Sequence, residues 1–196
     1  TPPTFTRPAD ITIFTSDTCG YDATIAVTGD VTDEADNVSI GLQATFSDAV
    51  ANGTCEGSKI ITRTWSLVDK CGNKAEDQIQ TITVKDNIAP TWTTAATALN
   101  TTIECSNTEA LATAQSKFPV ASDNCDADVT NIVKNAGQFV ANSDCANSGS
   151  YTNTWTVTDA CSNTSEVFTQ VITIEDKTAP TWTTAATALN TTIECS

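Results

Sequence analysis

The sequence predicts an all-β fold built from tandem repeats, and three observations lead to this prediction. Short segments that alternate polar with apolar or β-branched residues follow one another along the chain, bounded by Gly, Asn, Asp and Pro. Only residues 107–118 have a helical pattern. The pattern recurs with a period of 90 residues. Several short strands in about 90 residues, separated by turn signals, favour an antiparallel β-sandwich of the immunoglobulin type.

The repeat is visible in the positions of single residues and in one long identity. Trp65 and Trp155 are one period apart, as are Cys71 and Cys161, and the stretch APTWTTAATALNTTIECS occurs unchanged at residues 89–106 and 179–196. Independent divergence would have altered the exposed positions, so we expect a tandem array whose units are still being duplicated. The predicted units are the N-terminal repeat (residues 1–88), the C-terminal repeat (residues 89–178) and the truncated start of a third (residues 179–196).

The strands are predicted one by one from their alternation. They cover residues 9–15, 23–29, 59–69, 77–86, 151–159 and 167–176. A turn rich in Asp, Ser and Asn separates the last two, which predicts a hairpin. Trp65 and Trp155 lie in the middle of strands, so both are expected in the core. Pro90 and Pro180 follow the terminal strands and stiffen the linkers, which predicts repeats aligned end to end as an elongated rod.

The amino-acid composition argues against some classes of binding partner and favours others. The chain has 24 acidic and 9 basic residues and a net charge of −15. No segment clusters Lys or Arg, which argues against a nucleic-acid surface. No apolar run approaches the roughly 20 residues of a membrane span. An acidic surface favours solvent, a divalent cation or a basic surface as partner, although acidity can also serve only to keep an exported protein soluble.

Eight cysteines, with no CxxC pair and no His, argue against zinc and favour disulfides in an oxidising, extracellular setting. Spacing of 16 residues in both repeats suggests the pairs Cys55–Cys71 and Cys145–Cys161, which would leave Cys105 for Cys125 and leave Cys19 and Cys195 unpaired. The alternative pairs Cys125 with Cys145 and Cys105 with Cys161. One difficulty stands against Cys145–Cys161: if 151–159 is a single strand, Cys145 begins near its far end, and six residues reach back only about 20 Å.

Acidic and amide side chains gather at the predicted ends of the repeats. The linker residues would meet the hairpin turn and an Asp-rich loop of the next repeat, which predicts an oxygen-rich calcium site at the junction. Its ligands would be Asp86, Asn87, Asp123, Asp126, Asp159 and Asn163. The corresponding residues at the free N-terminal end are Asp33, Asp36, Asp69 and Asn73, and Asp176 would face the third repeat. Asp and Asn are also ordinary turn residues, so they could serve only to shape these loops.

Several segments resemble a known class of repeat. PPTFTRPADITIFTSDTC, ITRTWSLVDKCGN, TITVKDNIAP and the DNC of ASDNCDAD are similar to the HYR-like repeats of giant surface adhesins of Bacteroidetes, most closely the SprB-type gliding-motility adhesins. The resemblance implies an immunoglobulin-like sandwich in a long array, exported by the type IX route to the cell surface and used as an adhesive filament or its stalk. The N-terminal repeat departs from the pattern, because Val38 stands at the usual cysteine of the DNC element.

Other functional classes fit the sequence less well than this structural role. An enzyme is not expected, because the chain has no His and no GxSxG motif, and its acids recur in turns once per repeat. A carbohydrate- or protein-binding module is the alternative, with Tyr21, Tyr151, Trp92 or Trp182 as contact residues. The expected partners are neighbouring repeats of the same chain, and surface polysaccharide or other cell-surface components contacted by regions outside these residues.

Overall fold

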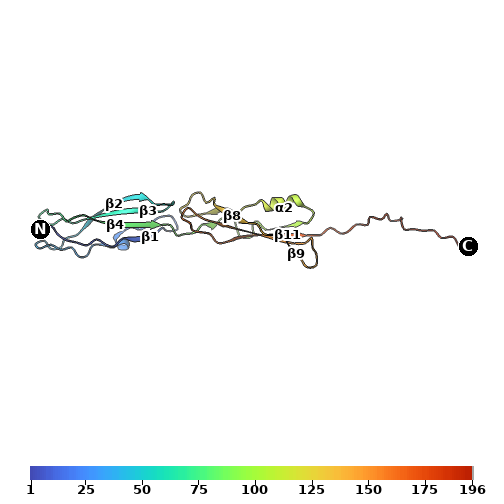
Figure 1. Ribbon diagram of the computed structural model, residues 1–196, viewed down its shortest axis with the longest axis horizontal. Helices are drawn as coiled ribbons and strands as arrows, with labels where there is room; N and C mark the ends of the chain where they lie inside the picture. Colours follow the sequence, from blue (N-terminus) through green and yellow to red (C-terminus); the bar gives the residue numbers. More distant parts are fainter. Residues whose placement is uncertain (196) are drawn as a thin grey trace.

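The computed structural model describes residues 1–195, and its strands form two main sheets. The N-terminal sheet has the order β1-β4-β3-β2, from β1 (Ile11–Phe14), β2 (Thr45–Asn52), β3 (Lys59–Ser66) and β4 (Gln78–Lys85). Figure 1 shows the two sheets one after the other along the longest axis of the molecule, with the chain termini at opposite ends.

The C-terminal sheet repeats this order in its main strands, β6-β11-β10-β8, with β9 also paired to β10. Its strands are β6 (Thr101–Glu104), β8 (Ile132–Asn135), β9 (Val140–Ala141), β10 (Gly149–Val157) and β11 (Phe168–Glu175). A separate ribbon joins β5 (Thr91–Trp92) to β7 (Ala121–Ser122). The two helices are α1 (Ile25–Thr28) and α2 (Thr108–Gln115).

Strand register is equivalent between β1–β4 and β6–β11 and between β3–β4 and β10–β11. β10 and β11 are antiparallel, which confirms the predicted hairpin, and β3 pairs with β4 in the same way. The first strand of each sheet instead lies parallel to the last, with Ile11 opposite Ile82 and Thr101 opposite Ile172. The sheets are therefore mixed, where a purely antiparallel sandwich was predicted.

Alternating side chains of the central strands form the core. Trp65 and Trp155 are 0% and 1% exposed, as predicted for tryptophans in mid-strand. The layer that covers this face is thin: α2 contributes Ala114 to a cluster with Ile103 and Ile172. The result is a mostly β fold in which one broad sheet packs against short ribbons, loops and a helix, which is consistent with a β-sandwich.

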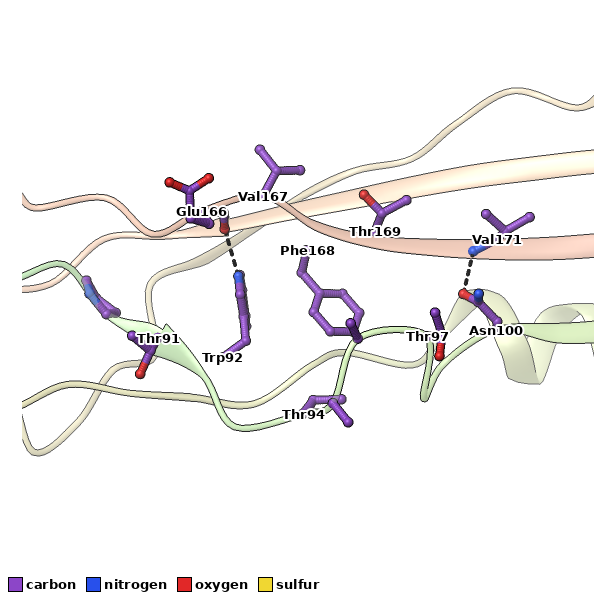
Figure 2. Close-up of a pocket in the computed structure, with 13 residues that line it drawn as sticks. Thr91, Trp92, Thr94, Thr97, Asn100, Glu166, Val167, Phe168, Thr169 and Val171 are labelled. Atoms are coloured by element: carbon purple, nitrogen blue, oxygen red, sulfur yellow. Dashed lines mark hydrogen bonds between the residues drawn. The ribbon is translucent and has the colours of Figure 1, made fainter.

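Trp92 of β5 belongs to this covering layer. Its ring packs edge-on against Phe168, with centroids 5.5 Å apart, and its indole N–H donates to the Glu166 carbonyl oxygen at 2.7 Å. Figure 2 shows the two rings side by side beneath β11, at the wall of a cavity of about 610 Å³. Trp92 therefore packs within its own repeat.

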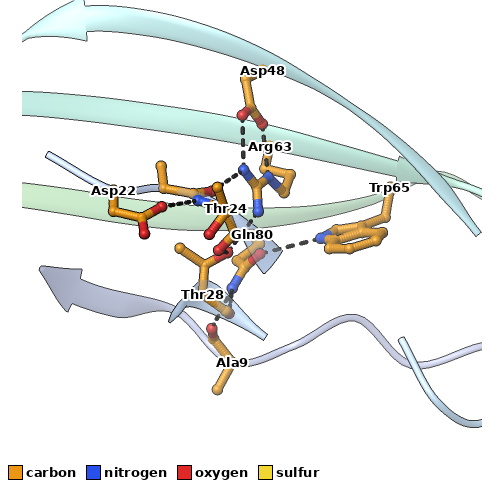
Figure 3. Close-up of polar contacts among 9 residues, drawn as sticks. Ala9, Asp22, Thr24, Thr28, Asp48, Arg63, Trp65 and Gln80 are labelled. Atoms are coloured by element: carbon orange, nitrogen blue, oxygen red, sulfur yellow. Dashed lines mark hydrogen bonds and ion pairs between the residues drawn. The ribbon is translucent and has the colours of Figure 1, made fainter. Parts of the chain in front are cut away.

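Buried polar side chains form a layer on the core face of the N-terminal sheet (Figure 3). Arg63 donates to both carboxylate oxygens of Asp48 at 2.8 Å and to the Thr28 hydroxyl at 2.6 Å. Gln80 accepts from the indole N–H of Trp65 at 3.2 Å and donates to the carbonyl oxygens of Ala9 and Thr28. In the C-terminal repeat, Asn153 and Gln170 take the places of Arg63 and Gln80, one period later.

Two predicted elements have different outcomes. Residues 107–118 contain α2, as predicted, and the Asn107 side chain caps it by accepting from the Ala110 N–H at 3.0 Å. Residues 23–29 were predicted as a strand, and this is wrong, because they form the single turn α1. The turn bends this segment around the Arg63 guanidinium, which donates to the Ala23 carbonyl and the Thr28 hydroxyl. A tertiary contact thus overrides local β propensity.

The predicted disulfides are wrong, because both bonds of the structure join the two repeats. Cys19 is bonded to Cys125 with Cα atoms 5.0 Å apart, and Cys55 to Cys161 with Cα atoms 5.2 Å apart. Among residues 1–195, the free cysteines are Cys71, Cys105, Cys145 and Cys195. Cys19 was expected to be unpaired, and only the prediction for Cys195 agrees with the structure.

The physical reason is strand length. Cys145 precedes β10 and Cys161 follows it, so nine strand residues at roughly 3.3 Å each separate cysteines whose Cα atoms must approach to about 6 Å. Cys55 and Cys71 are separated by β3 in the same way. Cys105 lies at the end of β6, beside the end of β11, whereas Cys125 and Cys161 lie at the opposite end of the repeat. The alternative pairing fails for the same reason.

No helix of the described residues is long and apolar enough to cross a membrane. Residues 179–195 repeat the sequence of β5 and β6 but contain no strand, and they extend away from the C-terminal sheet in Figure 1.

Candidate functional site

Three carboxylates from three segments meet where the repeats join. Asp86 follows β4, Asp123 follows β7, and Asp159 lies in the turn after β10. Each offers one oxygen, and the three oxygens lie within 4.8 Å of one another. We call these three residues the junction cluster. It combines a linker acid of one repeat with two loop acids of the next, as predicted from the sequence.

Backbone turns fix each carboxylate. Asp159 accepts from the backbone N–H and the side-chain amide of Asn163, both at 2.8 Å. Asp123 Oδ1 accepts from the N–H groups of Cys125 and Asp126, both at 2.9 Å. Asp86 Oδ1 accepts from the Thr15 hydroxyl and the Ile88 N–H, both at 3.1 Å. The turn-forming role of these Asp residues and their gathering at the junction are therefore compatible.

The junction cluster concentrates negative charge in a sheltered place. Asp86 and Asp159 are 7% and 6% exposed, and the buried Asp123 Oδ2 has no hydrogen-bond partner among the described residues. None of the ion pairs within residues 1–195 involves these three acids. Like charges this close repel strongly away from bulk water. Hard oxygen ligands without a basic partner are the donor set that suits Ca²⁺.

The other predicted junction ligands have supporting roles. Asn163 donates to the Asp86 carbonyl oxygen at 3.3 Å, which links the two repeats. Asp126 Oδ2 accepts from the Ala160 N–H at 2.9 Å and joins two loops of the C-terminal repeat. Asn87 is exposed, and within residues 1–195 its side chain makes no hydrogen bond. Asn124, which was not predicted, crosses the junction by donating to the Ser16 carbonyl oxygen at 2.9 Å.

The N-terminal end of the molecule carries part of the same arrangement. Asp69 accepts from the N–H and side-chain amide of Asn73, as Asp159 does from Asn163. The side-chain amide of Asn73 is the main cause that lowers the pKa of Asp69, while the nearby charge of Asp36 raises it. Asp36 Oδ1 is buried without a hydrogen-bond partner in the described chain, like its counterpart Asp123. Asp33 stands apart, since it accepts from the Thr6 N–H at 2.8 Å.

The C-terminal end presents the predicted Asp176 beside Glu104 and Cys105, with one ligand atom of each within 4.8 Å of the others. Burial is the main cause that raises the pKa of the Cys105 thiol, and the charges of Asp176 and Glu104 add to it. Asp176 itself is exposed. Asp176 thus stands at this end in the position that Asp86 has in the N-terminal repeat, one period earlier.

The disulfides were missed although the sequence contains a signal for them. Cys19–Cys125 and Cys55–Cys161 have the same separation of 106 residues. Two equal separations longer than the 90-residue period indicate bonds between successive repeats. The spacing of cysteines within one repeat suggests 16-residue loops instead.

Of the four aromatic residues predicted as contacts of a binding module, two pack against other rings and two are exposed. Trp92 is held against Phe168 beside the cavity of Figure 2, and Tyr151 packs on Phe139 with ring centroids 5.2 Å apart. Tyr21 and Trp182 are 39% and 96% exposed. The four do not form one aromatic platform of the kind that binds a sugar.

Comparison with known proteins adds one family. Residues 93–174 match the model of an HYR-like domain with four cysteines. This part of the chain is similar to an HYR-like domain. The matched segment contains four cysteines, which are Cys105, Cys125, Cys145 and Cys161. Together with the two disulfides, the match indicates an extracellular repeat module of the adhesion type.

Two other comparisons give one weak match and no match. A crystal structure of human mucin-like protocadherin EC1-2 matches with 11% identity and a TM-score of 0.31, over 89% of this chain and 98% of that one. A likeness this weak carries no structural or functional argument. The search of curated proteins found no significant match.

Proposed function

We propose that this chain is part of the stalk of a secreted adhesin, a non-enzymatic array of repeats held rigid at its junctions. The observation that carries the proposal is that both disulfides and the junction cluster occupy the same junction. A protein of freely hinged domains needs no cross-link between neighbours. Two covalent bonds and a shared set of acids instead limit bending at the linker, so that successive repeats form a rod.

Calcium at the junction is the second part of the proposal. Asp86, Asp123 and Asp159 would hold the ion, with water supplying the remaining oxygens of its six to eight ligands. The ion would supply the positive charge that the cluster lacks. Asn163 orients Asp159 and contacts the Asp86 carbonyl, so it acts as a positioning residue.

The biological setting follows from the resemblance to the Bacteroidetes adhesins. The array would reach the cell surface by the type IX route and serve adhesion or gliding, with neighbouring repeats as its direct partners. Surface polysaccharide or other cell-surface components would be bound by regions outside residues 1–196.

Small-angle X-ray scattering of the full 196-residue chain, in excess calcium and then in chelator, tests this function. We expect a rod-length maximum dimension in calcium, and a melting temperature several degrees lower in chelator, because an ion bound only to the folded state stabilises it by about 2.7 kcal/mol at 100 times its Kd. Glycan arrays should show no binding by the chain. A compact or freely bent chain, or a specific glycan ligand, would contradict the stalk.

A matched pair of variants separates the metal from the rod. Asp123→Asn keeps an oxygen for the N–H groups of Cys125 and Asp126 but removes a negative charge from the cluster. Asp36→Asn makes the same change at the N-terminal end, where no linker acid completes a cluster within the described chain. Only Asp123→Asn should abolish the calcium-dependent rise in melting temperature. If wild type binds no calcium while the rod persists, the metal proposal fails and the stalk stands on its disulfides.

A further inference from the structure

Two free cysteines lie at the end of the C-terminal repeat that faces away from the junction. Cys105 follows β6 and Cys145 lies in the loop before β10. At the same end of the N-terminal repeat, Cys19 follows β1 and Cys55 precedes β3, and both are bonded to the next repeat. Cys145 therefore stands at the position of the bonded Cys55 but is free, and Cys105 is a free cysteine directly after the strand that corresponds to β1.

Cys145 repeats the local structure of Cys55. Each begins a loop in which the serine N–H, of Ser58 or Ser148, donates back to the cysteine carbonyl at 3.1 or 3.0 Å. Each lies four residues before the first residue of its strand, Lys59 or Gly149. The loop that presents a cysteine to the next repeat is thus already formed around Cys145.

Cys105 does not occupy the same position as Cys19. Its N–H donates to the Glu175 carbonyl oxygen, as the Thr15 N–H does to Lys85, so Cys105 lies four residues nearer its strand than Cys19 does. It lines a cavity of about 360 Å³ together with Asn107, Asn147 and Tyr151. Cys105 is half-buried at this cavity, which is where an incoming loop would bring its cysteine.

The other end of the molecule supplies the complementary half. Cys71 is exposed and occupies the turn that Cys161 occupies one period later. In both turns the asparagine N–H, of Asn73 or Asn163, donates to the turn aspartate at 2.8 Å. Val38 stands at the position of Cys125 and is 75% exposed. This end therefore offers one thiol to a preceding repeat, where the C-terminal repeat uses two cysteines.

We propose that Cys145 forms a disulfide with the counterpart of Cys161 in a following copy of this repeat, and Cys105 with the counterpart of Cys125. Cys71 would bond the counterpart of Cys145 in a preceding copy. The array is then covalently cross-linked at successive junctions, with one bond instead of two where Val38 replaces cysteine. This inference rests on the proposed array of repeats.

The chemistry requires a disulfide oxidant, either a protein disulfide or oxidised glutathione. Two thiols lose two protons and two electrons as their S–S bond forms, and the oxidant is reduced to two thiols. Hydrogen bonds from the Ser148 hydroxyl and from the Asn147 N–H lower the pKa of the Cys145 thiol, which increases its thiolate fraction.

The test lengthens the full chain by a second copy of residues 107–178 after Ser196, which completes a third repeat. The protein is oxidised with glutathione disulfide, its remaining thiols are alkylated, and its cross-linked peptides are mapped by mass spectrometry. We expect peptides that join Cys145 to the copy of Cys161 and Cys105 to the copy of Cys125. Cys71, Cys195 and the copy of Cys145 should be alkylated. Cys145→Ser should leave the copy of Cys161 alkylated without affecting the Cys105 bond.

Cys19–Cys125 and Cys55–Cys161 in the same sample report that the first junction has formed. Given those bonds, a Cys105–Cys145 bond within one repeat, or alkylation of both residues, overturns the proposal. The unextended 196-residue chain gives a second reading: Cys105 and Cys145 must both be alkylated there, and a bond between them is equally decisive against it. If the extended chain scatters as a rod but lacks the bonds of Cys145 and Cys105 to the third repeat, this pairing is refuted and the stalk function still stands.

Discussion

Arg63 is a charged side chain inside the N-terminal repeat, where it is 1% exposed. Its guanidinium contacts both oxygens of Asp48, and its face lies 4.0 Å from the centroid of the Phe46 ring. The counterpart in the C-terminal repeat is the neutral Asn153. A buried charge whose partner is removed costs more free energy than the pair itself contributes.

Asp48→Ala should therefore destabilise the N-terminal repeat by about 3 kcal/mol, because Arg63 would keep its charge without a counterion. The control is Lys74→Ala, which breaks the exposed pair with Asp77 and should cost about 1 kcal/mol or less. Hydrogen exchange of the β3 amides measures both effects locally. Equal loss of protection in the two variants would show that burial of Arg63 adds nothing to the Asp48 contact.

At the scale of single elements, the strands could be predicted where alternation and burial agree. β3, β4 and β11 lie within their predicted ranges, and β10 overlaps its range but begins before it, at Gly149. β2 was not predicted, because all of its residues are exposed and no apolar face marks it. Residues 101–104 form β6, yet the same letters at 191–194 form no strand. Identical sequence takes both states because β6 has β11 as its pairing partner.

In the candidate site, too, some features follow from the local sequence and others depend on contacts between distant residues. The junction acids could be predicted because turn residues and linker residues mark the ends of repeats. The disulfides could not be predicted from short loops, because their pairing depends on which end of a strand each cysteine occupies. Strand direction and length decide that, and neither is encoded in the spacing of Cys145 and Cys161 alone.

Gln170 ties three elements of the C-terminal repeat together. It is 0% exposed, and its amide donates to the carbonyl oxygens of Leu99 and Ala114 while accepting from Asn153. Gln170→Leu should lower stability by about 2 kcal/mol or more, because buried carbonyls lose their donors. Thr169→Val on the exposed face of β11 is the control. Melting temperatures measure the difference, and a fall no larger than the control's would contradict this role.

At the scale of the whole molecule, the two disulfides interleave along the chain, in the order Cys19, Cys55, Cys125, Cys161. Each closes a loop that runs out of one repeat, across the linker and into the next. The linker around Pro90 therefore lies inside both loops. The repeats cannot separate unless both bonds are broken, even where the non-covalent contacts at Asn124 and Asn163 are lost.

Interleaved bonds also determine how the molecule responds to pulling. Tension applied at the chain ends passes through the disulfides and through residues 19–55 or 125–161, so the stretch between Cys55 and Cys125 carries none of it and the extensible chain is shortened by a length equal to 106 residues. Fully extended, that hidden length is about 36 nm. Single-molecule stretching should show this length only after reduction or in a variant lacking both bonds, whereas Cys19→Ser or Cys55→Ser alone should leave it hidden. Appearance of the full length in either single variant would contradict the interleaved connectivity. In oxidising surroundings the two disulfides limit how far the protein can extend under tension. Their redox state determines whether it can lengthen further.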